Sequence, residues 1–299
     1  MRANYFRLAL LLQHNHRGYA FEEIGAGTFE SNVGKQNIHD FLVASRTDSL
    51  TVVKGSDIVY EWRTPGFAAE EVHLIFSVTK SITSLLTGAL VKHCGLDVDA
   101  QVVKYVPEVA QSAFGNATVR NLLDMTAAFS FVEDYSPGPD IRDYRYSVGW
   151  YPAPIDAPRL HDFLASRKPD GEHGQRFRYL SPSTDLLGWV CEKVSGLPYH
   201  VALSQFVWQP MGAEHEANMT LARNGSPRAA GGLSVIPRDM ARVGMFVRDG
   251  GLGAIDDSYV HDVYSNGSHE QWAHGDFKDV FANGIYRSCF YKPGVDPDV

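Results

Sequence analysis

A serine and a lysine three residues apart stand at the start of the most clearly amphipathic helix that the sequence predicts. The pair is Ser77 and Lys80, within the run Phe76-Ser-Val-Thr-Lys-Ser81. A serine hydroxyl becomes an effective nucleophile when an adjacent base takes its proton. A lysine can be that base when burial lowers the pKa of its ammonium group toward neutrality. This spacing therefore predicts nucleophilic catalysis, although Ser-x-x-Lys should also occur about once by chance in a chain of this length.

The helix expected after Ser77 would bring the two side chains together. Residues three positions apart lie one turn from each other on the same helical face, so Lys80 would neighbour Ser77. Ser77 would also lie at the positive end of the helix dipole, where developing negative charge is stabilised. Gly95 stands where a helix C-cap is expected. Apolar residues recur with the spacing of one buried face at Ile82, Leu85, Leu86, Ala89 and Leu90.

The composition is that of a soluble globular protein. The chain has 299 residues, of which 44% are hydrophobic and 21% are charged, enough for a substantial core and for two lobes. A net charge of −8 argues against nucleic acid or an anionic membrane as the main partner. The three cysteines, Cys94, Cys191 and Cys289, are widely spaced without a Cys-x-x-Cys pair, which predicts free thiols in a reducing compartment.

The N-terminal segment does not have the features of an export signal. Its apolar run, residues 8–12, is too short, and Arg7 interrupts the approach to it. Residues 13–16 offer no small-residue cleavage site. No apolar segment elsewhere approaches the roughly 20 residues that a membrane-spanning helix needs. The sequence therefore predicts a cytoplasmic protein without a membrane partner.

Local patterns place further elements around the Ser77 helix. Two β-rich runs, Leu50–Lys54 and Ile58–Trp62, flank Gly55-Ser-Asp57 and predict a hairpin that packs behind this helix. Residues 133–158 contain five prolines and predict a long loop or lid. Helices are expected over 119–125 with Thr118 as N-cap, over 184–195 ending at Gly196, over 199–207 and over 237–247.

Six sequence blocks follow one another along the chain in an order that is typical of one superfamily. They are Phe76–Ser81; Leu122–Thr126 with Glu133–Tyr135; Gly149-Trp150; Phe177–Ser181 with Thr184–Trp189; Ala230–Leu233; and Asp239–Gly244. From about residue 15 to its C-terminus the chain resembles the serine β-lactamase and penicillin-binding-protein-like superfamily, in its class C-like branch. Within that branch it is most similar to the 6-aminohexanoate-dimer (nylon oligomer) hydrolases and related carboxylesterases.

The resemblance implies an α/β (α+β) fold of the β-lactamase-like type. In such a fold an antiparallel sheet is flanked by helices and carries an inserted, mostly helical lobe. On this basis residues 1–299 form one domain. Approximately residues 20–96 and 228–299 would make the sheet lobe, and residues 97–227 the helical lobe.

The resemblance also implies roles for individual residues. Ser77 takes the position of the acylated nucleophile, Lys80 that of its proton partner, and Tyr179 that of the tyrosine that reaches across from the helical lobe. An ammonium group favours ionisation of a neighbouring phenol, which can then relay a proton to the leaving group. Without the flanking match, Tyr179 would be a packed surface aromatic. Tyr135 and Trp150 match loop positions that line the substrate pocket, and ordinary loop packing is the alternative.

Two departures from the superfamily pattern bear on activity. Ser181 stands where many relatives have asparagine, and serine donates one hydrogen bond without the reach of an amide. We interpret Ser181 as a substrate-binding residue that favours esters and linear amides over β-lactams. The third motif, Lys-Thr-Gly or His-x-Gly-like on a late strand, has no clear counterpart. His173-Gly-Gln175 comes too early in the chain, and His274-Gly-Asp276 has no strand pattern around it.

The late segments predict that the sheet continues beyond this chain. In relatives, segments such as Gly284–Arg287 and Phe290-Tyr291 precede the third motif, so we expect that motif, with C-terminal strands and a helix, after Val299. At ordinary element lengths about 40–50 residues would be missing. The oxyanion hole would then keep only the Ser77 amide, and activity or solubility would be low.

Other chemistries find no support in the sequence. There is no Gly-x-Ser-x-Gly elbow, no His-Glu-x-x-His helix, and the twelve histidines are scattered without ligand spacing. We therefore expect no metal and no organic cofactor. The favoured interpretation is a cytoplasmic serine hydrolase acting on small amides or esters, with a homodimer as an open alternative to a monomer. The competing hypothesis is a catalytically impaired binding or sensor module, or a truncated inactive fragment.

The serine at position 181 leads to a prediction about selectivity. Short-chain p-nitrophenyl esters or linear amides should be cleaved far faster than penicillins or cephalosporins, because a serine cannot replace the amide group that assists β-lactam turnover. Initial rates with p-nitrophenyl acetate and with the chromogenic cephalosporin nitrocefin check this. A nitrocefin rate comparable with the ester rate would show that Ser181 does not favour esters and linear amides over β-lactams.

Overall fold

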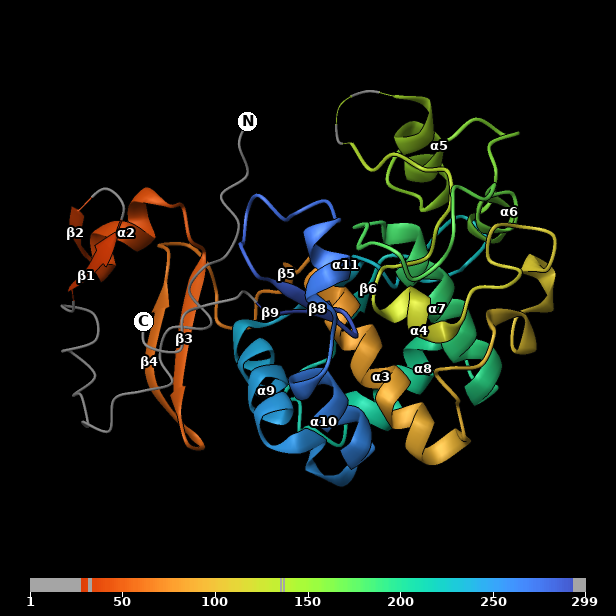
Figure 1. Cartoon of the computed structure of the whole chain (residues 1–299). Helices are drawn as coiled ribbons and strands as arrows, with labels where there is room; N and C mark the ends of the chain where they lie inside the picture. Colours follow the sequence, from red (N-terminus) through yellow and green to blue (C-terminus); the bar gives the residue numbers. More distant parts are fainter. Residues whose placement is uncertain (1–27, 32–33, 135, 137, 293–299) are drawn as a thin grey trace. The chain divides into compact units, whose positions relative to one another are not determined.

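The computed structural model describes residues 28–31, 34–134, 136 and 138–292, which fall into two compact units (Figure 1). Of the described residues, the first unit comprises those up to Glu71 together with Ile236–Ala241, and the second comprises Val72–Val235 together with those from Arg242 onward. Both Ser77 and Lys80 belong to the second unit.

The described part of the first unit contains two β-hairpins and a short helix. The hairpin of β3 and β4 is antiparallel, with Gly55 at φ 63° in its turn, and it confirms the hairpin predicted there. In the same unit, Arg238 donates to both carboxylate oxygens of Glu61 at 2.8 and 2.9 Å. The elements are β1 (Thr28–Ser31), β2 (Gly34–Asn37), α2 (Ile38–Ala44), β3 (Ser49–Lys54) and β4 (Asp57–Arg63).

The second unit is mostly helical, with short antiparallel strands between the helices. Its first half contains β5 (His73–Leu74), α3 (Val78–Cys94), η1 (Val102–Lys104), η2 (Pro107–Val109), α4 (Val119–Leu123), α5 (Pro139–Ser147), α6 (Leu160–Ala165), α7 (Ser181–Ser195), α8 (Tyr199–Leu203) and the π-helical turn η3 (Ser204–Trp208). Its second half contains β6 (Asn218–Met219), β7 (Leu233–Val235), most of α9 (Pro237–Arg248), η4 (Gly250–Gly253), α10 (Asp257–Ser265), α11 (His269–Ala273), β8 (Ile285–Arg287) and β9 (Phe290–Lys292).

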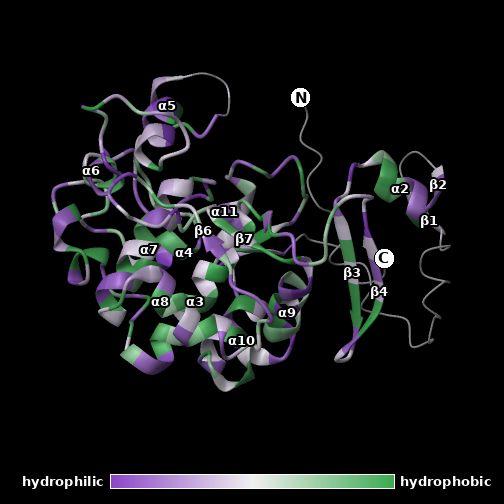
Figure 2. Cartoon of the chain, turned by 180° about the vertical axis from the view of Figure 1, so that it is seen from behind, coloured by the Kyte–Doolittle hydropathy of each residue, from purple (hydrophilic) through white to green (hydrophobic). Residues whose placement is uncertain are grey.

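Helix α3 is the central helix of the second unit and packs against α7, α8 and α10 (Figure 1). It begins after Ser77 and ends at Gly95, whose φ of 68° is left-handed, as the sequence predicts. Apolar residues recur along it (Figure 2), but it is buried on almost all sides rather than on one face. Its buried hydroxyls are bonded, for example Thr83 Oγ1 to Tyr199 Oη and Ser84 Oγ to Tyr259 Oη, both at 2.7 Å.

A three-stranded antiparallel sheet in the order β5-β7-β6 leads into α3. His73 pairs with Val235 and Leu74 with Ser234, and the ladder continues where Ile75 N donates to Leu233 O at 3.0 Å. The chain then turns into Ser77 and α3. This register places residues 229–233, which lead into β7 and include its first residue, beside the first turns of α3.

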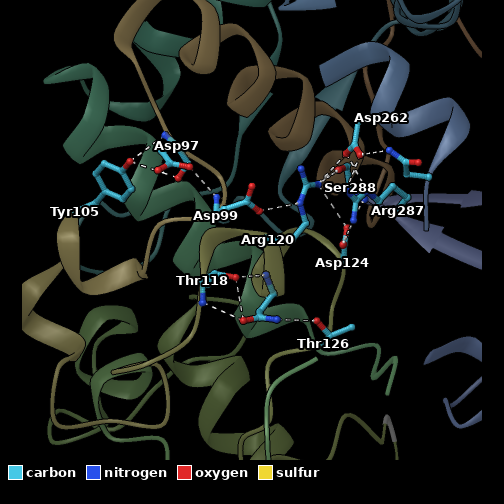
Figure 3. Close-up of polar contacts among 12 residues, drawn as sticks. Asp97, Asp99, Tyr105, Thr118, Arg120, Asp124, Thr126, Asp262, Arg287 and Ser288 are labelled. Atoms are coloured by element: carbon cyan, nitrogen blue, oxygen red, sulfur yellow. Dashed lines mark hydrogen bonds and ion pairs between the residues drawn. The ribbon is translucent and has the colours of Figure 1, made fainter. Parts of the chain in front are cut away.

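The hairpin of β8 and β9 is fixed to α4 and α10 by ion pairs (Figure 3). Arg287 donates to Asp124 at 2.6 Å and to both oxygens of Asp262 at 2.5 and 2.8 Å. Arg120 adds a contact with Asp262 at 3.1 Å, and Ser288 N donates to Asp124 at 2.8 Å. Because Asp124 is buried, burial raises the pKa of its carboxyl group, and the two guanidinium groups oppose that effect.

One predicted loop contains a helix. Residues 133–158 include α5, which was not predicted from the sequence because the prolines of this segment indicate a loop. Pro139 stands at the first position of the helix, where its missing N–H costs no hydrogen bond. Ile141, Tyr144 and Val148 are buried at helical spacing, so a buried apolar face stabilises α5.

The observed elements confirm the predicted fold class, a mixture of helices and antiparallel β-pairs. Thr118 caps α4 in a capping box with Asn121, and Gly196 ends α7 at φ 67°, both as predicted. The three cysteines are free thiols. Of the helices that the structure describes, none combines the length and the apolar character needed to span a bilayer. The division into lobes at residues 96 and 227 stays a prediction.

Two helical glycines give a matched stability prediction. A Cβ at Gly88 in α3 would lie 2.5 Å from Tyr259 Cδ1 and 2.7 Å from Ile255 Cγ2, whereas a Cβ at Gly244 in α9 meets no atom within 4 Å. Gly88→Ala should therefore destabilise the protein by about 1–3 kcal/mol through overpacking. Gly244→Ala should stabilise it by up to about 1 kcal/mol through helix propensity. Urea unfolding of both variants tests whether Tyr259 and Ile255 lie this close to Gly88. Equal changes in the free energy of unfolding would contradict it.

Candidate active site

Ser77 lies at the junction of strand β5 and helix α3. The preceding residue, Phe76, has φ 43°, a left-handed conformation that costs a non-glycine residue on the order of 1–3 kcal/mol and persists only where the surroundings impose it. Ser77 itself has helical angles, φ −67° and ψ −9°, and immediately precedes the first residue of α3. The Phe76 side chain is 53% exposed, so this sharp turn lies at the surface of the second unit.

The Lys80 side chain is buried and contacts Ser77. Its Nζ donates to Ser77 Oγ at 3.0 Å and to Ala230 O at 2.7 Å, and the residue is 1% exposed. Burial lowers the pKa of Lys80 to about 8, against the opposing influence of the Glu133 carboxylate. A substantial fraction of Lys80 is therefore neutral near pH 8. The structure brings together the serine and the lysine base that the sequence predicts.

The Tyr179 ring lies next to the same ammonium group. Its centroid is 5.0 Å from Lys80 Nζ. Tyr179 lies just before α7, and its backbone N–H donates to Asp276 at 2.9 Å. The ring also packs against Phe277 and Tyr291, with centroids 5.6 and 6.2 Å away. This position agrees with the predicted arrangement of a tyrosine beside the lysine.

Ser181 and Glu133 form a polar pair at the start of α7. The Ser181 hydroxyl donates to one oxygen of the Glu133 carboxylate at 2.5 Å, and the Ser181 backbone N–H donates to the other oxygen. A carboxylate at this place satisfies a free N–H of the helix and interacts favourably with its dipole. Ser181 is 2% exposed, and its hydroxyl group donates its proton in the hydrogen bond to Glu133. Its predicted contact with substrate stays a prediction.

Trp150 lies against the turn that carries Ser77. Its ring meets the Phe76 ring edge-on, with centroids 6.1 Å apart and an interplanar angle of 83°. The guanidinium carbon of Arg228 lies 3.8 Å from the Trp150 ring centroid. The predicted pocket residue Trp150 is therefore close to the nucleophile. Tyr135, the other predicted pocket aromatic, lies outside the described residues.

Asp185 is a site residue that the sequence patterns did not single out. Its carboxylate accepts from Tyr144 Oη at 2.5 Å and from Ala230 N at 2.8 Å, while Ala230 O accepts from Lys80. Asp185 thus fixes residue 230, whose carbonyl oxygen binds the lysine. Burial raises the pKa of the Asp185 carboxyl group, and the nearby Arg228 opposes this effect. Asp185 lies inside the Thr184–Trp189 sequence block, and that block was the one feature of the sequence that pointed to it.

The two histidine sequences that resemble the third motif have local partners. His173 Nδ1 accepts from Ala128 N at 2.9 Å, and His274 Nδ1 lies 2.9 Å from Glu270 O of its own helix α11. The turn between β8 and β9 contacts α3 instead, through Ser81 Oγ, which donates to Cys289 O at 2.8 Å. The motif expected after Val299 lies outside the described residues.

No metal cluster occurs in the part of the chain that the structure describes, where no three His, Cys, Asp or Glu side chains gather in positions to share an ion. The expected absence of a metal and of an organic cofactor stays a prediction.

Comparisons with known proteins agree on one family. The Beta-lactamase family model matches residues 36–288. A 6-aminohexanoate-dimer hydrolase from Paenarthrobacter ureafaciens is 35% identical over 254 residues, which are 83% of this chain and 64% of that relative's length. The chain thus spans less than two thirds of this relative.

Solved structures support the same fold. A Bacillus anthracis protein assigned as a 6-aminohexanoate-dimer hydrolase superposes with a TM-score of 0.79 at 21% identity, covering 91% of this chain and 72% of its own. A penicillin-binding protein from Bacillus halodurans superposes with a TM-score of 0.64 at 20% identity, covering 86% and 84%. The expected β-lactamase-like fold is confirmed.

The charges around Lys80 lead to a prediction about pH. Reaction of Ser77 with a fluorophosphonate probe should accelerate as pH rises and level off above about 8, where Lys80 is neutral. The Glu133 carboxylate raises the pKa of Lys80, so Glu133→Gln should shift this rise to lower pH. Labelling rates from pH 6 to 10 test this. Glu172→Gln, on an exposed loop, is the control, and an unmoved or upward-shifted profile for Glu133→Gln would contradict the assignment.

Proposed function

The chain belongs to the beta-lactamase family, and from that premise we propose that it is a serine hydrolase of small linear amides or carboxylic esters, acting through an acyl-enzyme on Ser77. The observation that carries the proposal is the contact of 3.0 Å between the Ser77 hydroxyl and the buried Lys80 amine. A serine next to a lysine whose pKa is lowered to about 8 meets the requirement for an activated nucleophile.

The first half of the reaction forms the acyl-enzyme. Neutral Lys80 takes the proton from Ser77 Oγ, which attacks the substrate carbonyl carbon and forms a bond to it. The negative charge on the carbonyl oxygen develops near the Ser77 amide at the start of α3, a favourable place for an anion. Tyr179 gives its proton to the leaving nitrogen or oxygen as the bond to the carbonyl carbon breaks. Lys80 then returns a proton to Tyr179.

The second half releases the acid. Water attacks the ester carbonyl of the acyl-enzyme and gives one proton to the base formed by Lys80 and Tyr179. The bond between Ser77 Oγ and the carbonyl carbon breaks, and Ser77 recovers its proton from the same base. Each group returns to its starting state, so the cycle needs no cofactor.

The substrate class follows from the relatives and from position 181. The similarity to a 6-aminohexanoate-dimer hydrolase supports linear amides. Esters belong to the same class because an alkoxide departs more easily from the carbonyl carbon than the nitrogen anion of an unprotonated amide does. The proposal includes a cytoplasmic location, as predicted from the sequence.

Replacement of the nucleophile tests the proposed function. Ser77→Ala should abolish hydrolysis of p-nitrophenyl esters, because no other group forms the acyl-enzyme, and should leave the thermal unfolding midpoint nearly unchanged. Ser265→Ala removes a hydroxyl from an exposed position at the end of α10 and serves as the matched control. Mass spectrometry of the wild-type protein after fluorophosphonate treatment should locate the adduct on Ser77. Residual activity of Ser77→Ala within tenfold of wild type would refute the proposal.

A further inference from the structure

Arg228 is a buried cation for which the described residues provide no anionic partner. The residue is 5% exposed, and its Nε makes no hydrogen bond. No carboxylate in the described part of the chain lies within 4.0 Å of its guanidinium group. Burying a charge is costly unless a partner compensates it, and most buried polar groups in proteins have one. A buried guanidinium group without such a pair therefore indicates a partner that the described residues do not supply.

Two carboxylates of the site, those of Asp185 and Glu133, do not supply this partner. Asp185 accepts hydrogen bonds from Tyr144 and Ala230 N, and Glu133 accepts two from Ser181. The guanidinium group of Arg228 lies close enough to influence the pKa of Asp185 but makes no ion pair with it. Both anions thus have neutral donors of their own.

Two aromatic rings hold the guanidinium group in place. Its carbon lies 3.8 Å from the centroid of Trp150 and 5.6 Å from that of Tyr144. Such contacts favour the cation and orient its plane without using its N–H groups. The arginine is thereby preorganised, and its N–H donors remain available for a planar anion.

The guanidinium group lies beside the turn that carries the nucleophile. A Cβ added to Gly231 would lie 2.3 Å from Arg228 Nη1 and 3.7 Å from the carbonyl carbon of Phe76. Phe76 directly precedes Ser77, and Trp150 contacts both Phe76 and Arg228. A substrate whose carbonyl group reaches Ser77 would therefore pass close to Arg228.

We propose that Arg228 binds a carboxylate of the substrate, so that this site is selective for linear amides and esters carrying a free carboxylate. The inference rests on the proposed function and narrows its substrate class. Arginine pairs with a carboxylate through two parallel hydrogen bonds, which lysine cannot form. Arg228 would thus position the chain of the substrate while Ser77 attacks the carbonyl group.

Kinetics with matched amides test the selectivity. The substrates are N-hexanoyl-6-aminohexanoate, with a carboxylate at the amine end, the mono-hexylamide of adipate, with a carboxylate at the acyl end, and neutral N-hexylhexanamide. Wild type should prefer at least one anionic amide over the neutral amide by about tenfold to a hundredfold in kcat/KM, the range expected for a charged hydrogen bond. Arg228→Met should lose this preference, and Arg228→Lys should keep part of it.

Arg223→Met is the matched control. Arg223 stands five residues earlier, is exposed, and donates to Pro154 O and Ala157 O at 2.9 and 2.8 Å. Its replacement should leave the ratio of anionic to neutral kcat/KM unchanged. An equal ratio in wild type and Arg228→Met would overturn the inference even if all three amides are hydrolysed.

A binding measurement separates this inference from the proposed function. In Ser77→Ala protein, calorimetry should show N-hexanoyl-6-aminohexanoate binding at least tenfold more tightly than in the double variant with Arg228→Met. Arg228-dependent binding without hydrolysis by wild type would refute the proposed function and leave the anion site standing. Hydrolysis of the neutral amide that depends on Ser77, with anion binding independent of Arg228, would refute only the anion site.

Discussion

The site depends on the contact between the first turns of helix α3 and the segment 229–233. Three side chains of α3 bind this segment: Thr79 Oγ1 accepts from Leu233 N at 3.2 Å, Lys80 Nζ donates to Ala230 O at 2.7 Å, and Thr83 Oγ1 donates to Ala229 O at 2.8 Å. The pairing of β5 with β7 sets the register of both partners. Lys80 is therefore buried and positioned by the same hydrogen bonds that join the helix to the sheet.

The charges around Lys80 are arranged so that its proton can move. A carboxylate bonded directly to Lys80 would stabilise the ammonium form and keep the lysine protonated. Asp185 instead binds the backbone N–H of Ala230, the residue whose carbonyl oxygen contacts Lys80, and Glu133 accepts hydrogen bonds from Ser181. The lysine meets a hydroxyl and a carbonyl oxygen, and burial has the largest effect on its pKa. Neutral hydrogen-bond donors thus hold both anions near the base without a direct ion pair.

Local patterns in the sequence predicted the elements better than the contacts between them. Spacing alone predicted the proximity of Ser77 and Lys80, because neighbours on one helical turn must meet. Long-range contacts left no such pattern: Ala230 lies 150 residues from Lys80, and an isolated aspartate or arginine in a helix or loop has no periodicity. Asp185 and Arg228 were missed for this reason. Helix α5 was missed because its prolines indicated a loop, whereas burial of its apolar face decided the outcome.

The close approach of Gly231 and Arg228 limits which residues can replace either of them during evolution. Because even a methyl group at position 231 would overlap Arg228 Nη1, the guanidinium group can occupy its place only while position 231 carries no side chain. The two positions form one steric unit, and homologues with a larger residue at 231 should also have replaced the arginine. A change of preferred substrate could therefore begin at the glycine, with a single methyl group displacing the cation while Ser77 and Lys80 remain untouched.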